Sequence, residues 1–445
     1  MVKKIYEKPI INKINAGVPD KSGMATHIKE IPEIEGIPVE EITKEYGSPV
    51  FVVSEKIIRE TYQDAYRAFS TRYPKVQFAW SYKTNYLDAV CNVYKDLGSW
   101  AEVVSMFEYE KAQRNGIKTQ NIIFNGPYKS KETLKTAVEN GSYIHIDNFD
   151  ELYNLAEVLQ TVDKKAKVAI RINMETGIYP QWDRFGFNYE NGEAWTAITL
   201  IMKQEKMQLV GLHTHIGTYI LLPSAYGVAA SKMSNLMLRI KAKYNHVISY
   251  IDLGGGFASK NTLKGAYLPG KDTCPTFDQY AEAITNAINN SGIEINDLPT
   301  LFLETGRALI DDAGYLIGKV KANKQLANGR KSLVLDVGIN NLFTSFWYNH
   351  DVYPAHVKSH SLEDITLYGP LCMNIDCLRA AIHFPPMDID DHIVIVRVGA
   401  YNLSQWMQFI SYRPNVVMID TKGKMHLIRR AENLETFTSQ EVSIK

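Results

Sequence analysis

Two short segments of the sequence combine residues suited to binding an anion or a planar cofactor. In IDLGGGF (251–257), three consecutive glycines let backbone amides approach an anion closely, although a flexible turn has the same composition. In HTHIGT (213–218), two histidines are spaced to share one face of a strand, which is compatible with a metal. No third soft or acidic ligand is obvious near them, so we expect no metal. An imidazole stacked on a planar cofactor, with the Thr218 hydroxyl on its phosphate, fits this neighbourhood better.

Lys83 ends the apolar run in QFAWSYKTN (77–85), with serine, threonine and asparagine around it. Lysine stems often lie along apolar surface with the ammonium in water, so an isolated strand-end lysine is most simply a surface residue. A role in chemistry requires that other strands bring polar residues to the same place. The elements that carry these residues therefore decide the interpretation.

Eight short strand-like runs recur between residues 77 and 306. They are 77–83, 99–105, 121–126, 143–148, 167–173, 208–216, 247–255 and 300–306. Helix-like segments such as KETLKTAVENG and FDQYAEAITNAINN separate most of them and close near Gly or Asn, as helices tend to. This alternation predicts an α/β fold, a (β/α)8 TIM-like barrel of parallel strands.

Polar and charged residues gather at the carboxyl ends of these strands, where such barrels carry their active sites. They are Lys83, Glu102, Ser105, Asn125, Asp147, Arg171, Asn173, His213, His215, Gly254, Gly255, Gly256, Glu304 and Arg307. Phosphate sites after strands seven and eight are common in this fold, which matches the position of the glycines. We therefore interpret Lys83 as a site residue rather than a surface residue.

The sequence pattern changes after about residue 310. Runs such as YLIGKVKANKQ and HIVIVRVG alternate apolar and polar residues without helices between them, which predicts a separate β-sandwich or β-barrel domain. The expected organisation is an N-terminal extension over 1–35, a strand region over 36–50 that joins the β domain, the barrel over 51–310, and the C-terminal β domain over 311–445.

Composition excludes several classes of protein. The 445 residues include 49 basic and 49 acidic side chains, so no charge excess favours nucleic acid or an anionic membrane. No apolar stretch reaches about 18 residues, and the N-terminus has no signal-peptide core. Four cysteines do not form a disulfide framework in a chain of this size. We expect a cytoplasmic protein that binds a small molecule, and neither nucleic acid nor membrane.

The segment SYKTN resembles the Y-x-K-x-N Schiff-base motif of fold-type III pyridoxal-phosphate enzymes. The similarity continues in order through AEVVS, HTHIGT, DLGGGF, ETGR, GPLCMNID and GAY, over roughly residues 40–420. The chain is most similar to the diaminopimelate decarboxylase group, relatives of the ornithine and arginine decarboxylases. The resemblance implies a lyase of amino-acid metabolism that uses pyridoxal 5'-phosphate and works as a homodimer.

The same resemblance implies roles for individual residues. Lys83 would hold pyridoxal phosphate as an internal aldimine, and decarboxylation would run through an external aldimine and a quinonoid carbanion. Glu304 would pair with the pyridine nitrogen and keep it protonated, so that the ring accepts electrons. His215 would stack on the ring, and Glu102 would lie near it or form a structural salt bridge. The other implied cofactor contacts are Arg171, Thr218, Gly255, Gly256, Gly306, Arg307 and Tyr401.

Cys372, in GPLCMNID, stands at the family's proton-donor position. The resemblance implies that the second subunit supplies this cysteine across a dimer interface, whereas an isolated buried cysteine is usually inert packing. Amino-acid racemases of the same fold typically have an arginine against the ring nitrogen and a tyrosine in place of the cysteine. Glu304 and Cys372 therefore favour decarboxylation. A non-enzymatic pyridoxal-phosphate carrier, built on a barrel alone, has no use for a proton donor.

The expected contacts to the distal end of the substrate depart from the family pattern. DVGINNLFTSFWY (336–348) has Thr344 and Ser345 where the family has Arg-Pro, so a bidentate carboxylate clamp is lost. Met373 replaces a glutamate, which removes a charge that a buried ammonium needs. A conjugated or carrier-bound amino acid is therefore an alternative to diaminopimelate. The candidate substrate contacts are Arg307, Thr344, Tyr348, Met373 and Tyr401.

Overall fold

The computed structural model describes residues 28–359 and 361–444, which form two compact units. The β unit contains the residues up to Ser54 together with Lys260–Thr273 and the chain from Asp312 onward. The barrel unit contains Glu55–Ser259 and Cys274–Asp311. Of the expected N-terminal extension, residues 1–27 lie outside the described residues.

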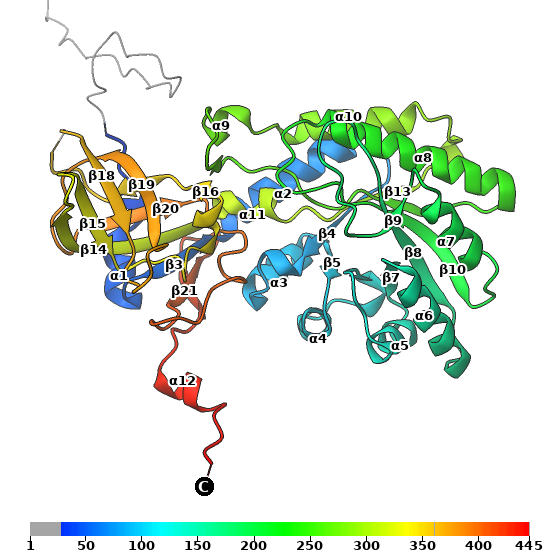
Figure 1. Ribbon diagram of the computed structural model, residues 1–445, viewed down its shortest axis with the longest axis horizontal. Helices are drawn as coiled ribbons and strands as arrows, with labels where there is room; N and C mark the ends of the chain where they lie inside the picture. The colour runs from blue at the N-terminus through cyan, green and yellow to red at the C-terminus, as the bar shows by residue number, and fades with distance from the viewer. Residues whose placement is uncertain (1–27, 360, 445) are drawn as a thin grey trace, which may run out of the picture. The chain divides into compact units, whose positions relative to one another are not determined.

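Eight parallel strands form the barrel unit (Figure 1). They are β4 (Val76–Ser81), β5 (Trp100–Val103), β6 (Ile122–Phe124), β7 (Tyr143–Ile146), β8 (Ala166–Asn173), β10 (Met207–His213), β11 (Tyr250–Asp252) and β13 (Thr300–Leu303). The order around the sheet is β10-β11-β13-β4-β5-β6-β7-β8, and a pairing between β8 and β10 closes it. A short strand, β9 (Phe187–Asn188), pairs with the end of β8. Each of the eight predicted runs overlaps one strand of this ring, so the predicted fold class is confirmed.

Helices lie between successive strands of the ring, and one more precedes its first strand and another follows its last. They are α2 (Glu55–Ser70), α3 (Asp88–Asp96), α4 (Met106–Arg114), α5 (Lys131–Asn140), α6 (Phe149–Thr161), α7 (Glu193–Ile201), α8 (Ser224–Tyr244), α10 (Phe277–Asn289) and α11 (Arg307–Ile310). Local sequence sets their ends: Ser130 caps α5 by accepting a hydrogen bond from the Thr133 amide, and Gly141 ends it with a φ of 70°. Among the described residues, no helix is long and apolar enough to cross a membrane.

Apolar side chains fill part of the barrel interior. Tyr250 and Phe302 belong to a buried cluster that also contains small and branched residues from β4, β6 and β8. Tyr250 fits because its neighbour in register on β10 is Gly211, where a Cβ atom would lie 2.1 Å from the tyrosine ring. These side chains come from the first or middle residues of their strands. The residues that close the strands therefore lie above an apolar layer.

The β unit is built mainly on a nine-stranded sheet. Its strands are β3 (Val50–Ser54), β14 (Gly314–Gln325), β15 (Lys331–Leu335), β17 (Val352–Pro354), β18 (Glu363–Tyr368), β19 (Cys377–Phe384), β20 (His392–Val396), β21 (Asn415–Ile419) and β22 (Met425–Arg429). The runs YLIGKVKANKQ and HIVIVRVG, predicted as strands after residue 310, correspond to β14 and β20, whereas β17 and β19 were not predicted. Strand β3 pairs with β14 and β21.

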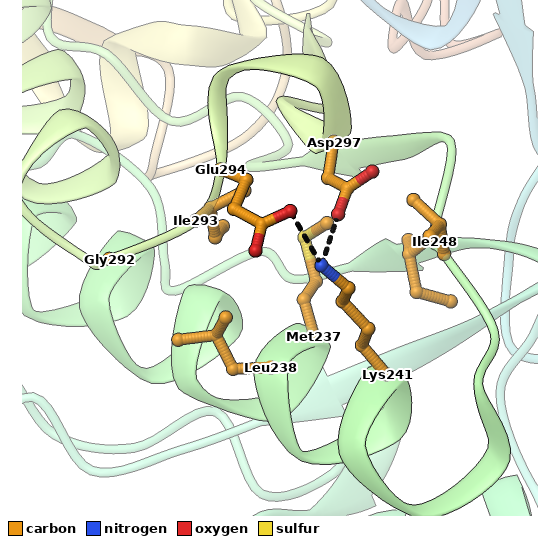
Figure 2. Close-up of a pocket in the computed structure, with 9 residues that line it drawn as sticks. Met237, Leu238, Lys241, Ile248, Gly292, Ile293, Glu294 and Asp297 are labelled. Atoms are coloured by element: carbon orange, nitrogen blue, oxygen red, sulfur yellow. Dashed lines mark hydrogen bonds and ion pairs between the residues drawn. The ribbon is translucent and has the colours of Figure 1, made fainter.

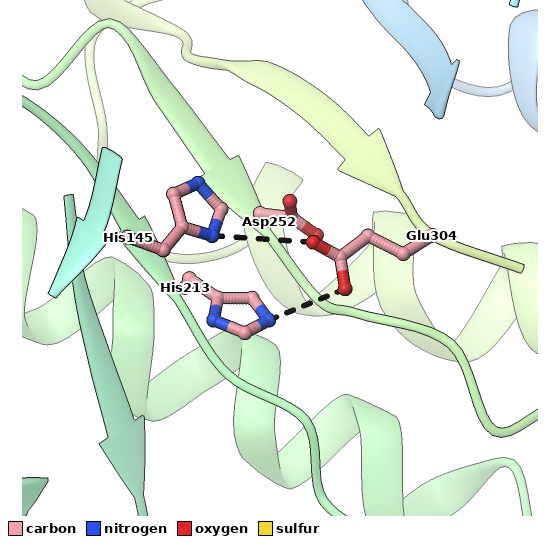
Figure 3. Close-up of side chains that lie close together, drawn as sticks. All are labelled: His145, His213, Asp252 and Glu304. Carbon is pink, nitrogen blue, oxygen red and sulfur yellow. Dashed lines mark ion pairs between the residues drawn. The ribbon is translucent and has the colours of Figure 1, made fainter. Parts of the chain in front are cut away.

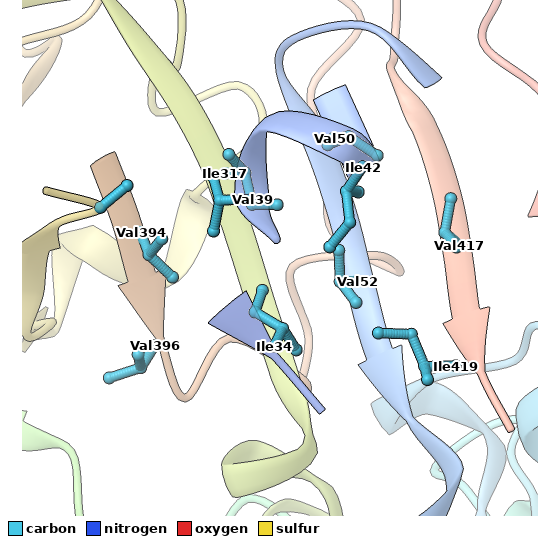
Figure 4. Close-up of a cluster of buried hydrophobic side chains, with 11 residues drawn as sticks. Ile34, Val39, Ile42, Val50, Val52, Ile317, Val394, Val396, Val417 and Ile419 are labelled. Carbon is cyan, nitrogen blue, oxygen red and sulfur yellow. The ribbon is translucent and has the colours of Figure 1, made fainter. Parts of the chain in front are cut away.

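Smaller elements complete the β unit. They are β1 (Glu33–Ile34), β2 (Ile37–Pro38), α1 (Val39–Tyr46), β12 (Thr262–Leu263), α9 (Gly270–Thr273), η5 (Phe343–Phe346), β16 (Tyr348–Asn349) and α12 (Leu434–Thr438). Branched side chains of β3, β14, β20 and β21 meet α1 in one buried cluster, in which Val50, Val52 and Ile317 are fully buried (Figure 4). This core supports the β unit independently of the barrel.

Candidate active site

Lys83 lies directly after β4, in the short 3-10 turn Tyr82–Thr84, and its ammonium contacts a buried carboxylate. The Nζ atom of Lys83 lies 2.5 Å from Oε2 of Glu102, which is fully buried on β5. The Ser81 hydroxyl donates to the same oxygen. Burial raises the pKa of Glu102, and the charge of Lys83 opposes this effect. A half-exposed amine held against a buried acid at the mouth of a barrel is suited to covalent chemistry with a carbonyl group.

Glu304 follows β13 and lies among buried polar side chains. Asn125 Nδ2, after β6, donates to both of its carboxylate oxygens, at 3.2 and 3.3 Å. His213 Nε2 lies 3.5 Å from Oε2, and His145 Nδ1 lies 3.9 Å from Oε1 (Figure 3). Asp252, on β11, is close enough to belong to the same group. The four side chains His145, His213, Asp252 and Glu304 are called the Glu304 layer below.

The sequence showed no third soft or acidic metal ligand near His213. The structure corrects this expectation, because His145, Asp252 and Glu304 lie close to it in the Glu304 layer. One ligand atom from each of its four members lies within 4.8 Å of the others. Nitrogen and carboxylate oxygen are donors that Zn²⁺ accepts, but tetrahedral ligands at ordinary zinc distances lie about 3.3 Å apart. The layer is therefore wider than a formed zinc site. Sequence spacing missed His145 and Asp252, because their neighbours lie on other strands.

The glycines after β11 form a close backbone junction around His215. Gly254 and Gly256 have φ angles of 66° and 94°, which favour glycine, and a Cβ on Gly256 would lie 2.2 Å from the Gly217 oxygen. The Gly255 amide donates to Nδ1 of His215 at 3.0 Å, which leaves the ring proton on Nε2. Burial lowers the pKa of His215 well below its ordinary value, so the ring is neutral. A neutral, fixed imidazole is suited to stacking on a planar ring.

The remaining barrel residues of the predicted site differ in exposure. Thr218 is exposed, whereas Arg171 is buried, with its guanidinium 3.8 Å from Asp147 and over the Phe185 ring. Arg307 lies 3.7 Å from Asp311 at the start of α11. Gly306 is buried, and a Cβ there would lie 2.0 Å from the Thr84 hydroxyl. Gly306, after β13, thus lies next to Thr84, the residue that follows Lys83.

Five predicted site residues belong to the β unit: Thr344, Tyr348, Cys372, Met373 and Tyr401. Thr344 is buried, and its hydroxyl is within hydrogen-bond distance of His350 Nε2 at 2.8 Å and of Asn402 Oδ1 at 2.9 Å. Cys372 is exposed. Tyr401 has a φ of 65°, a strained conformation for a residue with a side chain.

Two surface pockets lie elsewhere in the described part of the chain. One, of about 60 Å³, lies between α8 and the turn Ile295–Asp297, where Lys241 pairs with Glu294 and Asp297 (Figure 2). The other, of about 240 Å³, lies on the β unit beside Lys331. None of the predicted site residues lines either pocket, so neither is the site predicted from sequence.

The fit of these residues to pyridoxal phosphate can be judged from the geometry. Buried polar atoms without a hydrogen-bond partner among the described residues include Oε1 of Glu102 and both ring nitrogens of His213. Close backbone approaches at Gly255 and Gly256 leave no space for side chains. An amine, a stacking imidazole, a buried carboxylate and a glycine junction are the groups such a cofactor requires.

Known proteins resemble the chain over nearly its whole length. The sequence model of the family described as "Pyridoxal-dependent decarboxylase, pyridoxal binding domain" matches residues 59–311. Diaminopimelate decarboxylase of Methanocaldococcus jannaschii is 29% identical over 427 residues, covering 92% of this chain and 94% of its own. The Bacillus subtilis enzyme of that name is 27% identical over 434 residues, covering 93% and 95%. The solved M. jannaschii structure in complex with L-lysine has a TM-score of 0.86 at 27% identity, covering 94% of this chain and 98% of its own.

Proposed function

Because the family match spans more than half of the chain, this protein belongs to the pyridoxal-dependent decarboxylases, and we propose that it removes the carboxyl group of an amino acid or amino-acid-derived substrate at the barrel mouth. The observation that carries the proposal is the 2.5 Å contact between Lys83 and the buried Glu102 at the end of β4. Pyridoxal 5'-phosphate supplies an electron sink for the broken Cα bond. All other steps fall to residues of this chain.

Lys83 is assigned the covalent attachment of the cofactor. Glu102 holds the Lys83 ammonium before the cofactor is attached, and it would accept a hydrogen bond from the same amine again once a substrate amine has released it. Glu304 is assigned to the pyridine nitrogen, where a carboxylate keeps a proton on the ring. His215 is assigned to one ring face, because its neutral ring is fixed by the Gly255 amide.

The phosphate is assigned to the glycine junction and the start of α11. Gly255, Gly256 and Gly306 allow close backbone approach, and Arg307 supplies positive charge. Thr218, Arg171 and Tyr401 complete the assigned contacts. The α11 helix has only four residues, so backbone amides and side chains, not a helix dipole, carry this assignment.

Cys372 is assigned the return of a proton to Cα. Its turn is held by Asp376, whose two carboxylate oxygens accept hydrogen bonds from the Ile339 and Leu371 amides at 2.8 and 2.7 Å. We propose a homodimer in which each subunit supplies Cys372 to the other's Lys83. Mixing the inactive variants Lys83→Ala and Cys372→Ala tests this, because heterodimers with one intact site would restore about a quarter of the activity. No recovery on mixing contradicts the shared site.

The substrate is proposed to differ from diaminopimelate at its distal end. Thr344 already uses its hydroxyl on His350 and Asn402, so it does not replace a carboxylate clamp. Met373 offers a thioether where an ammonium would need a charge. Thr344 and Met373 therefore favour a substrate whose distal end is uncharged, conjugated or presented on a carrier. Arg307, Tyr348 and Tyr401 are the other proposed substrate contacts.

The test is an assay of CO2 release by purified protein with pyridoxal phosphate against amino acids and their conjugates. Borohydride treatment followed by mass spectrometry should place a cofactor adduct on Lys83, and Lys83→Ala should lose both adduct and activity. Rapid turnover of meso-diaminopimelate would refute the interpretation of Thr344 and Met373. Exchange of the Cα proton with inversion and no CO2 would identify a racemase instead.

A further inference from the structure

The Glu304 layer contains two buried histidines that the proposed function leaves unused (Figure 3). His145 comes from β7 and His213 from β10, the two strands that flank β8 in the ring. Both side chains are fully buried, with ring centres 4.6 Å apart. Neither ring nitrogen of His213 has a hydrogen-bond partner among the described residues. Buried imidazole nitrogens without a hydrogen-bond partner are costly unless they serve a neighbouring group.

Each histidine presents one nitrogen to one oxygen of Glu304. His213 Nε2 faces Oε2 at 3.5 Å, and His145 Nδ1 faces Oε1 at 3.9 Å. These distances are somewhat longer than hydrogen bonds, as is common at sites that tighten when the ligand binds. Asn125 donates to both oxygens through one nitrogen, and Asp252 shares a side-chain hydrogen bond with Glu304.

The hydrogen bond between Tyr250 and His145 is compatible with a ring proton on the nitrogen that faces Glu304. The Tyr250 hydroxyl lies 2.9 Å from His145 Nε2. When the tyrosine donates to Nε2, the ring proton resides on Nδ1, the nitrogen that faces Glu304. Gly211 provides the space for the tyrosine ring, because a Cβ there would collide with it. The position of the Tyr250 hydroxyl beside His145 therefore depends on Gly211, the neighbour of Tyr250 in the apolar layer of the barrel.

The charges around the layer keep both histidines as neutral N–H donors. Burial lowers the pKa of His145 and of His213 well below the ordinary value, and the charges of Arg171 and Lys129 act in the same direction on both. Lys83 adds to the effect on His213, whereas Glu304 opposes it on His145. Burial, and then the charge of Glu304, raise the pKa of Asp252 well above its ordinary value.

We propose that His145 and His213 are positioning residues that fix the Glu304 carboxylate against the ring nitrogen of the cofactor, each by donating a ring N–H to one oxygen. This inference rests on the proposed function and assigns the hydrogen bonds that orient its buried acid. Positioning partners of this kind typically change activity 10- to 100-fold when removed, as a rough guide from metal sites.

Paired substitutions test the assigned nitrogens. The amide nitrogen of glutamine reaches about where Nε2 stands, and that of asparagine where Nδ1 stands. His213→Gln and His145→Asn should therefore retain most of the wild-type kcat. His213→Asn and His145→Gln should lower kcat about 10- to 100-fold with KM within about threefold. If the two substitutions at a position behave alike, the proposal is overturned.

Two spectroscopic readouts on the full-length protein separate positioning from simple loss of structure. With 15N-labelled cofactor, the ring nitrogen should be protonated in wild type and His213→Gln and less so in His213→Asn. With 13C-labelled glutamate, the infrared band of the Glu304 carboxylate is identified as the one that disappears in Glu304→Gln. This band should shift in His213→Asn and in His145→Gln, but not in His213→Gln or His145→Asn. An unshifted band overturns the positioning role even if decarboxylation stands. If the Glu304 band shifts in these two variants but no cofactor attaches to Lys83, the histidines still orient Glu304 and the proposed function is wrong.

Discussion

The ion pair between Lys129 and Glu151 is the most completely buried one among the described residues that support the barrel mouth. Lys129 Nζ lies 2.5 Å from Glu151 Oε1, and the two side chains are 0% and 3% exposed. Lys129 also donates to the Gly126 carbonyl at 2.9 Å, next to Asn125. Glu151 accepts a hydrogen bond from the Asp147 amide at 3.0 Å. The pair thus fixes the ends of two strands.

Replacing Lys129 by methionine should lower the free energy of unfolding by about 3–5 kcal/mol, because a buried carboxylate is left without its cation. Lys131 provides a matched control. Its pair with Glu157 has the same 2.5 Å distance, but the side chains are 48% and 62% exposed. Lys131→Met should cost about 1 kcal/mol or less, since water screens an exposed pair. The double variant Lys129→Met, Glu151→Gln should recover much of the loss, because the glutamine still accepts from the Asp147 amide.

Urea unfolding of the variants at several pH values measures these differences. Burial raises the pKa of Glu151 above its ordinary 4.5, and Lys129 opposes that shift. Removing Lys129 raises the pKa of Glu151 further. The folded protein is then most stable below pH 4.5, where Glu151 is protonated, and it loses stability as the pH rises through the folded-state pKa of Glu151. The deficit of Lys129→Met should therefore grow from pH 4.5 to pH 8. Equal deficits for Lys129→Met and Lys131→Met, or a deficit that shrinks with rising pH, would refute the reasoning.

Three further predictions follow from buried positions. Burial, with the charge of Glu102, raises the pKa of Glu108 to about 7, so its stabilising contribution is lost as the pH rises from 4.5 through 7. Glu108→Gln should therefore raise the free energy of unfolding, measured with urea above pH 7, by about 1–3 kcal/mol. Gly211→Ala should cost about 1–3 kcal/mol by collision with the Tyr250 ring, measured by thermal unfolding. Gly256→Ala should weaken cofactor affinity at least about tenfold in a titration, because its Cβ would meet the Gly217 oxygen. Gly192→Ala, with a similar φ of 90° and open space, should leave that affinity unchanged.

Strand spacing and the strand-end rule were sufficient to predict the barrel and its mouth. All eight strands could be recognised as short strand-like runs between helix-like segments. Parallel strands are buried on both faces, so each one carries a largely continuous apolar stretch. The rule then brought Lys83 and Glu102 together, since they close neighbouring strands β4 and β5. Strand β19 was not predicted because Cys377–Phe384 has few buried residues and no regular alternation.

Contacts across the barrel interior could not be predicted in the same way. His145 and Tyr250 meet although they are 105 positions apart, on strands that do not pair. Their approach depends on barrel radius, stagger and the missing side chain of Gly211, which spacing along the chain does not encode. Asp252 was not recognised as a possible metal ligand near His213 for the same reason, since the two residues lie on different strands.

Two amides of the glycine triplet bind side chains of the protein rather than an anion. The sequence suggested amides that approach an anion. In the structure, the Gly254 amide donates to Asp252 Oδ1 at 2.8 Å and the Gly255 amide to His215 Nδ1 at 3.0 Å. Both contacts orient side chains of the same mouth. Because each amide provides only one proton, the Gly254 and Gly255 amides are not available to the phosphate, which would have to be bound by other backbone amides and side chains of the mouth. Loss of those other donors should weaken phosphate binding without moving His215.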